Sequence, residues 1–440
     1  MPEPLVVLST GSVNGRLFLA GTFLVAVVLI WFGVRWQFGS MVAVSTAAND
    51  PKTRALADSA MSLSPNDPYA MWLKAEVNRD LITPENVEPS LRRFEDVVRK
   101  APNDYRWWIE LGRTAEQAGQ PEMAESAFIT AIELAPSYAY PHWQMGNFLL
   151  RAGREEDALA ELRRAASNDH TYREQVFSLA WDFFGHDAVR VEDLAGSTPD
   201  SRVGLAFFFA ARGQAKDSLR VWNTLSEEQK SENAQIARTI AQAFTERKFF
   251  REGLEFSRQT GIDPDAQAET FTNGGFERSL GNSDDNFYGW NVDRSDNKLD
   301  ITTDSSVKRS GNRALKVNFR VFAKPQIANP WQIIVVEPGQ SYALKFWVRT
   351  ADIRSAGMPL VEVLDAAESR LLARSPEVDV GTNDWREINI SFTAPQRSDG
   401  IVVRLARTYC GESCPLVGTL WLDDFSITRN GKYPIDEMGQ

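Results

Sequence analysis

The chain has 440 residues, which is more than one hydrophobic core usually serves, so we expect two or three domains. Its composition is that of a globular protein, with 43% hydrophobic and 24% charged residues. A formal net charge of −11 argues against a nucleic-acid-binding surface, because such a surface needs basic side chains to neutralise phosphates.

An uncharged, strongly apolar segment near the N-terminus runs from Leu17 to Val34, between Arg16 and Arg35. This length crosses a hydrocarbon core as a helix, and the tryptophans near its end suit a membrane interface. A cleaved signal peptide usually has a shorter apolar segment of about 7–15 residues. A buried core helix would have a polar face. We predict an uncleaved membrane anchor over residues 1–38, followed by a linker over 39–50.

Residues 51–262 have helical periodicity and an internal repeat. Six apolar or small residues return 34 positions later: Leu111, Gly112, Gly119, Ala124, Phe128 and Ala131 recur as Met145, Gly146, Gly153, Ala158, Leu162 and Ala165. With Trp108 and Pro136, this pattern resembles the tetratricopeptide repeat, a pair of packed helices. An earlier repeat is longer, and the pattern degenerates beyond Asp169. The resemblance implies a right-handed α-solenoid of about five to six helix pairs.

Solenoids of this family resemble protein-binding scaffolds, and residues of the first helix of each pair line most of their groove. Such positions predict a partner groove at Tyr105, Arg106, Glu110, Arg113, Tyr140, Asn147 and Arg151. Residue by residue, a solvated helix face is the commoner role for side chains of this kind. Trp108 falls on a packing position of the repeat, so we expect it in the core.

Residues 268–430 consist of short β-branched and aromatic runs separated by turn signals, which is typical of an antiparallel sandwich. The segment begins with Asn273-Gly274-Gly275-Phe276-Glu277 and ends with Trp421-Leu422-Asp423-Asp424-Phe425. These motifs resemble those of the jelly-roll carbohydrate-binding modules of bacterial xylanases and glucanases. The resemblance implies that Glu277 and Asp423 hold a structural calcium, which takes hard oxygen ligands. The alternative is that both are solvated residues at strand ends.

A sugar-binding face needs an aromatic ring for the apolar side of a pyranose and planar polar groups for its hydroxyls. Alternation along the strands places such side chains outside the core. The predicted carbohydrate-binding residues are Trp347, Arg349, Glu362, Asn389 and Arg404, with Trp331 as a further candidate of unassigned facing. They form one site only if they share one sheet. Otherwise this is an ordinary polar face, or one that docks on the solenoid.

Cys410 and Cys414, the two cysteines of the chain, lie in one loop between strands. We predict a disulfide, which is expected only in an oxidising compartment. Together with the resemblance, this places the bulk of the chain on the periplasmic or extracytoplasmic side of a bacterial inner membrane. Catalysis has little support, because the three histidines lie in the helical part and no nucleophile motif is present.

The sequence therefore predicts a multidomain protein: a transmembrane helix, an all-α solenoid, an all-β jelly-roll sandwich and a tail over 431–440. We expect a non-enzymatic scaffold of the cell envelope, with a protein partner in the solenoid and an exopolysaccharide or surface polysaccharide on the sandwich. One alternative is a purely structural subunit of a membrane assembly, without a sugar ligand. A glycoside hydrolase with a cryptic carboxylate pair is the third interpretation.

Overall fold

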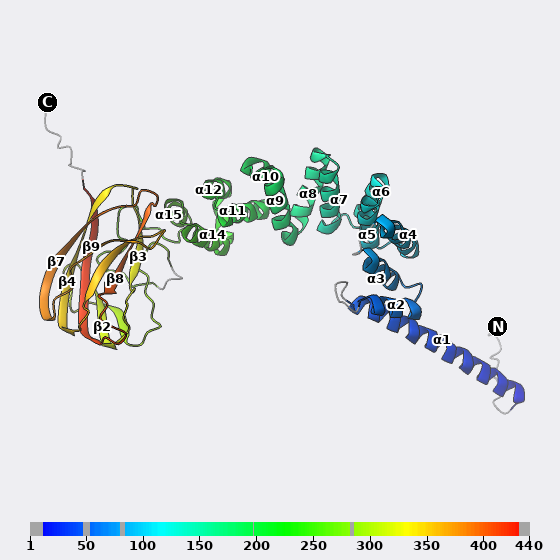
Figure 1. Ribbon diagram of the computed structural model, residues 1–440, viewed down its shortest axis with the longest axis horizontal. Coiled ribbons are helices and arrows are strands. Elements are labelled where there is room, and N and C mark those ends of the chain that lie inside the picture. Colours follow the sequence, from blue (N-terminus) through cyan, green and yellow to red (C-terminus); the bar gives the residue numbers. More distant parts are fainter. Residues whose placement is uncertain (1–11, 47–52, 80–83, 197, 282–285, 431–440) are drawn as a thin grey trace, which may run out of the picture. The chain divides into compact units, whose positions relative to one another are not determined.

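The computed structural model describes residues 12–46, 53–79, 84–196, 198–281 and 286–430. Figure 1 shows helices through the first part of the chain and strands through the last. The chain divides into two compact units, Met1–Ala195 and Gly196–Gln440. The first unit is helical, and the second joins further helices to the β-sandwich. The predicted tail at 431–440 lies outside the described residues.

Helix α1 (Val13–Ser45) is long and apolar enough to cross a membrane, by length and composition. Near its C-terminal end it packs against α2 (Thr53–Leu63). Gly39 leaves no room for a Cβ beside Leu63, and Ala43 is buried in a cluster with Ala57 and Ala60. The linker predicted for 39–50 is therefore helical as far as Ser45, because Gly39 is a close-packing position and not a flexible joint. Residues 47–50 lie outside the described chain.

The other helices of the first unit form antiparallel pairs: α3 (Pro68–Arg79) with α4 (Pro84–Lys100), α5 (Tyr105–Gln117) with α6 (Pro121–Leu134), α7 (Ala139–Arg151) with α8 (Glu155–Asn168), and α9 (His170–Phe183) with α10 (Ala188–Ala195). The repeated glycines allow the close approach. A Cβ added to Gly112 or Gly146 would lie 2.7 Å from the side chain of Phe128 or Leu162, respectively. The 34-residue period is thus one helix pair.

The second unit begins with α11 (Pro199–Ala211), α12 (Ala215–Trp222), α13 (Glu227–Glu232), α14 (Ala234–Glu246) and α15 (Phe250–Gln259). Counting α11/α12 and α14/α15, the described residues contain six helix pairs, in agreement with the predicted five to six. In four pairs the turn between helices places a glycine in the left-handed region, with φ of 70° at Gly119, 74° at Gly153, 62° at Gly185 and 75° at Gly213. In the α14–α15 turn, Lys248 takes the same place with φ of 68°.

The sandwich consists of two antiparallel sheets. One has the strand order β1-β2-β9-β4-β7 and the other β3-β8-β5-β6. The strands are β1 (Leu299–Asp304), β2 (Ala314–Phe322), β3 (Trp331–Val335), β4 (Ser341–Arg354), β5 (Pro359–Asp365), β6 (Leu371–Arg374), β7 (Gly381–Thr393), β8 (Gly400–Arg407) and β9 (Leu416–Arg429). Their alternating apolar residues form one core between the sheets, as the predicted all-β sandwich requires.

Helix α15 packs on the outer face of the four-stranded sheet. Phe250 and Leu254 form a buried cluster with Tyr288, Ile333 and Val335. The hydroxyl of Tyr288 donates a hydrogen bond to the Phe250 carbonyl at 2.7 Å. This helix therefore belongs to the hydrophobic structure of the sandwich and covers part of one face.

Candidate functional site

A row of polar and aromatic side chains crosses the outer face of the four-stranded sheet. The strand registers pair Trp331 with Arg404, Arg404 with Glu362, and Glu362 with Arg374, so the row has one member on each strand. At the usual strand spacing it extends about 14 Å. Arg404 donates from Nε and Nη2 to Glu362 Oε2 at 3.0 and 2.8 Å. The Arg374 side chain is exposed and has no ion-pair partner among the described residues.

Two hollows flank this row and share Ala328 and Arg404. One measures 410 Å³ and lies between Trp331, Val402 and the α14–α15 turn. The other measures 370 Å³, and its lining includes Gln326, Glu362, Arg374 and Tyr409. We call the row and its two hollows the sheet groove. An indole ring beside guanidinium, carboxylate and amide groups provides both stacking and hydrogen-bonding chemistry.

The loop that places Tyr409 at the groove is held by a disulfide and by the side chain of Arg407. Cys410 and Cys414 are disulfide-bonded, with Cα atoms 5.8 Å apart. The buried guanidinium of Arg407 donates to the carbonyl oxygens of Cys414 at 2.8 Å and Gly357 at 2.9 Å. Burial lowers the pKa of Arg407. These contacts fix the loop, while the Tyr409 ring stays 63% exposed.

The six predicted carbohydrate-binding residues do not share one face. Trp331, Glu362 and Arg404 lie in the sheet groove, whereas Trp347, Arg349 and Asn389 lie on β4 and β7 of the five-stranded sheet. Alternation shows which side of a strand a residue faces, but it does not show to which sheet the strand belongs.

On the five-stranded sheet, the three predicted residues already have partners within the chain. The Arg309 guanidinium lies 4.3 Å from the centre of the Trp347 ring. Arg349 Nε is 3.8 Å from an Asp384 carboxylate oxygen. The Asn389 amide donates to a Glu387 carboxylate oxygen at 3.0 Å. This face has less free binding chemistry than the sheet groove.

Several groove residues were missing from the predicted set. Arg374 lies on a four-residue strand too short for an alternation pattern. Gln326 and Tyr409 lie in loops, where no periodicity applies. Lys248 belongs to the helical part of the chain, and only tertiary packing brings it to the sandwich.

The carboxylates of Glu277 and Asp423 accept hydrogen bonds from the backbone of one loop, which connects β1 to β2. The Asn312 N–H donates to both Glu277 carboxylate oxygens at 2.8 and 3.0 Å, and the Arg309 N–H donates to Asp423 Oδ2 at 2.8 Å. The hydrogen bond from Asn312 lowers the pKa of Glu277, whereas burial raises the pKa of Asp423. Asp423 is fully buried, and no basic side chain in the described chain forms an ion pair with it.

These carboxylates are hard oxygen donors that fit the chemistry of calcium. A Cβ built on Gly275 would lie 3.8 Å from Asp424 Oδ1, 4.0 Å from Asp423 Oδ1 and 4.0 Å from the Cγ methylene of Glu277. Among the described residues, no group of three or more His, Cys, Asp and Glu side chains is arranged to hold a metal ion.

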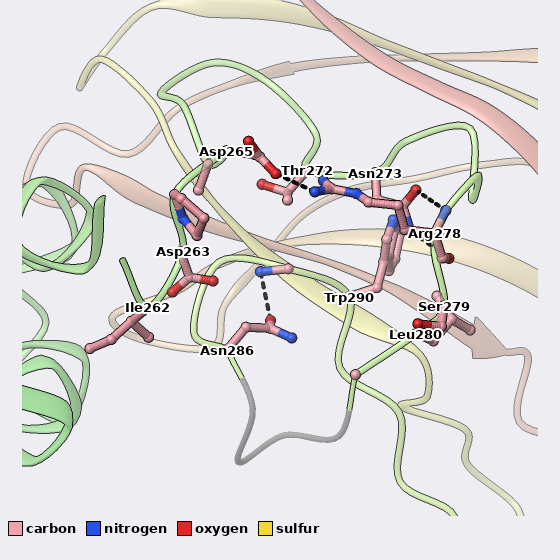
Figure 2. Close-up of a pocket in the computed structure, with 14 residues that line it drawn as sticks. Ile262, Asp263, Asp265, Thr272, Asn273, Arg278, Ser279, Leu280, Asn286 and Trp290 are labelled. Carbon is pink, nitrogen blue, oxygen red and sulfur yellow. Dashed lines mark hydrogen bonds and ion pairs between the residues drawn. The ribbon is translucent and has the colours of Figure 1, made fainter. Parts of the chain in front are cut away.

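A third cavity, of 310 Å³, lies where the sandwich begins (Figure 2). Its polar side chains form ion pairs and hydrogen bonds with the loops that line the cavity. Arg278 pairs with Asp265, and Asn273 exchanges hydrogen bonds with the Arg278 backbone. Asp263 accepts from the Phe287 N–H at 3.1 Å. We therefore regard this cavity as structural.

The predicted partner-groove residues lie on α5 and α7, the first helices of their pairs. Most of them contact each other or neighbouring helices. Arg151 forms two hydrogen bonds with Glu116, at 2.6 and 2.8 Å, and Arg113 pairs with Glu110 at 3.1 Å. The remaining contacts are those of Tyr105 with Tyr138, Arg106 with Asp104 and Tyr69, Tyr140 with Tyr172, and Asn147 with the Trp143 carbonyl.

His142 is buried between α7 and α8. Its Nδ1 lies 2.6 Å from a Glu161 carboxylate oxygen, and its Nε2 lies 3.0 Å from the Pro136 carbonyl. Burial lowers the pKa of His142, but these two acceptors outweigh burial and raise it above the ordinary value. Since both neighbours are acceptors, both ring nitrogens donate only in the imidazolium form. This histidine has a structural role.

Comparisons with known proteins find one family match and several similar solved structures. Residues 268–408 match a family described as a carbohydrate binding domain. No curated protein matches the chain. The matched residues include the four-stranded sheet and most of the five-stranded sheet of the sandwich.

Among solved structures, one described as "CBM4 structure and function" is 15% identical over 36% of this chain and 99% of that chain, with a TM-score of 0.27. A thermophilic TPR protein of Thermus thermophilus is 19% identical over 48% of this chain and 98% of that chain, with a TM-score of 0.27. MamA of Desulfovibrio magneticus is 22% identical over 31% of this chain and 75% of that chain, with a TM-score of 0.26.

Proposed function

We propose that the protein is a membrane-anchored scaffold that binds a glycan in the sheet groove and a protein partner through its helix pairs. The row formed by Trp331, Arg404, Glu362 and Arg374 is the observation that carries the glycan assignment. The half-buried Trp331 ring provides a platform for the apolar side of a pyranose. The Arg404–Glu362 pair holds donors and acceptors in a fixed plane for ring hydroxyls.

The test is isothermal titration of the whole chain against a panel of bacterial polysaccharides. Trp331→Ala should weaken binding by about tenfold or more, since buried aromatic anchors dominate most binding sites. Trp347→Ala is the matched control, because this ring lies on the other sheet and is covered by Arg309. Loss of binding in the control but not in Trp331→Ala would show that the glycan binds the five-stranded sheet and overturn this assignment.

A second function is supported by α15, which covers part of the same sheet face. On this view the sandwich is an interaction module of a membrane assembly and has no sugar ligand. The titration distinguishes the two functions. Absence of binding to every polysaccharide of the panel would favour the structural role.

We propose that α1 is retained as a membrane anchor. Its C-terminal end packs on α2 through Gly39 and Ala43, and Arg35 donates to the Ser62 carbonyl at 2.6 Å. Cleavage after α1 would remove part of that buried cluster. The mass of the mature protein, isolated from membranes, tests this: loss of the first 40 or so residues would contradict an anchor.

The Cys410–Cys414 disulfide supports an extracytoplasmic position for the sandwich, at the cell envelope of a bacterium. We propose that a protein with a glycan-binding sandwich and a protein-binding solenoid takes part in exopolysaccharide or surface-glycan assembly. Maleimide should not label either cysteine in the native, unreduced protein. Labelling of both thiols would contradict this placement.

We also propose a structural calcium held by Glu277 and Asp423. The buried carboxylate of Asp423 supports it: it accepts backbone hydrogen bonds but has no ion pair among the described residues, and a buried charge is costly unless a cation compensates it. Calcium at this position would bind only the native state and stabilise it by mass action. Chelation with EDTA should lower the melting temperature of the sandwich in the wild type and much less in Asp423→Asn. An equal response of both proteins would argue against the site.

A further inference from the structure

The 410 Å³ hollow of the sheet groove is built by two parts of the chain that are distant in sequence. Trp331, Val402 and Arg404 come from the sandwich, while Thr245 and Lys248 come from the α14–α15 turn. The turn reaches this place because Phe250, two residues further on, is buried against Ile333 and Val335. One wall of the groove therefore belongs to the helical part of the second unit.

Lys248 stands where four other helix pairs have a glycine. Gly119, Gly153, Gly185 and Gly213 each follow the C-cap of a first helix at positive φ, and Lys248 follows the C-cap of α14 at φ of 68°. A side chain in this left-handed conformation destabilises the turn, because its Cβ crowds the backbone. Residues held in such conformations tend to occur at functional sites. The lysine is exposed, and its ammonium group has no ion-pair or hydrogen-bond partner among the described residues.

The groove as a whole is cationic, although the chain carries a net charge of −11. Its lining has four cationic side chains, those of Lys248, Arg374, Arg404 and Arg407, against the carboxylates of Glu246 and Glu362. Glu362 is occupied by Arg404, and Glu246 accepts from the Gln242 amide at 2.8 Å. Two cations, Lys248 and Arg374, stay unpaired within the described part of the chain.

We infer that the α14–α15 turn is part of the glycan site and that Lys248 selects a polysaccharide bearing uronic acid carboxylates. This inference rests on the proposed glycan function of the sheet groove. The unpaired ammonium group supplies a charge-assisted hydrogen bond to a carboxylate, which a neutral sugar cannot accept with the same strength. Arg374, at the other end of the row, provides a second cation for a repeating acidic chain.

The experiment uses the whole chain and a panel of bacterial uronic acid polysaccharides, each paired with its carboxyl-reduced form. Wild-type protein should prefer the acidic form, and added salt should reduce this preference. Lys248→Gly should lose roughly tenfold or more in affinity for the acidic form and little for the reduced form. Its melting temperature should be unchanged or higher, because glycine relaxes the turn. Arg247→Ala is the control, since it removes a neighbouring cation outside the groove lining.

The outcomes separate this inference from the function on which it rests. Equal affinity of wild type and Lys248→Gly for the acidic polymers, with binding still dependent on Trp331, would overturn the role of the turn and preserve the glycan site. Equal binding of acidic and reduced forms by the wild type would overturn the selection of uronic acids. Absence of binding to both forms of every polymer would overturn both proposals.

Discussion

Truncation of Phe250 to alanine should destabilise the sandwich, although Phe250 belongs to a helix of the solenoid. Its ring is 1% exposed and covers Gly400, which leaves no room there for a Cβ. It also contacts the cluster that contains Ile333 and Val335. Removal of a buried phenylalanine side chain destabilises a protein by about 3–5 kcal/mol. We expect most of this loss to appear in β3 and β8, since those strands lie beneath the ring.

Hydrogen exchange of the whole protein, measured by mass spectrometry at increasing denaturant, resolves the free energy of opening segment by segment. Peptides from β3, β8 and α15 should lose protection together in Phe250→Ala. Phe207→Ala is the matched control, because that ring lies in the same unit and is 36% exposed. Full protection of β3 and β8 in Phe250→Ala, with α15 alone opened, would refute the shared core.

Three further predictions concern stability. The first concerns His142, whose pKa is raised in the folded protein. Its protonated side chain therefore contributes to the unfolding free energy below about pH 6.5, and this contribution is lost as pH rises through the folded pKa. The urea midpoints of wild type and His142→Gln should converge at high pH. Replacement of Cys410 and Cys414 by serine should lower the unfolding free energy by about 2 kcal/mol in a denaturant titration, as expected for a short disulfide loop. Gly112→Ala should lower it by about 1–3 kcal/mol, since the added Cβ meets the Phe128 ring; an unchanged midpoint would contradict the close packing.

The helix pairs could be predicted from the sequence because their packing positions recur at a fixed spacing. Gly112 and Phe128 meet within one pair, and the same contact returns as Gly146 and Leu162. The prediction of a linker was wrong for residues 39–45, which are helical, because Gly39-Ser40 is typical both of a flexible joint and of a close helix contact. Only the position of α2 beside Gly39 distinguishes the two.

The groove was only partly predictable. Alternation placed Glu362 and Arg404 on an outer face, but the strand order separates β5 and β8 from β4 and β7. That order depends on pairings between distant segments, which a local pattern does not contain. The contribution of Lys248 has a local signal, since it replaces the glycine of the repeated turn, but its position beside Trp331 depends on tertiary packing.

The direct packing of α1 on α2 limits how far the first helix pairs can move from the end of α1. A flexible linker would let them explore a wide volume, whereas a continuous helix of 33 residues ends inside their first hydrophobic cluster. With Leu17–Val34 in a bilayer, a partner bound to the first helix pairs would be confined to a thin layer at the membrane surface. Confinement of this kind raises the effective concentration of bound molecules for one another. The close contact at Gly39 would thus favour reactions between neighbouring complexes in the plane of the membrane.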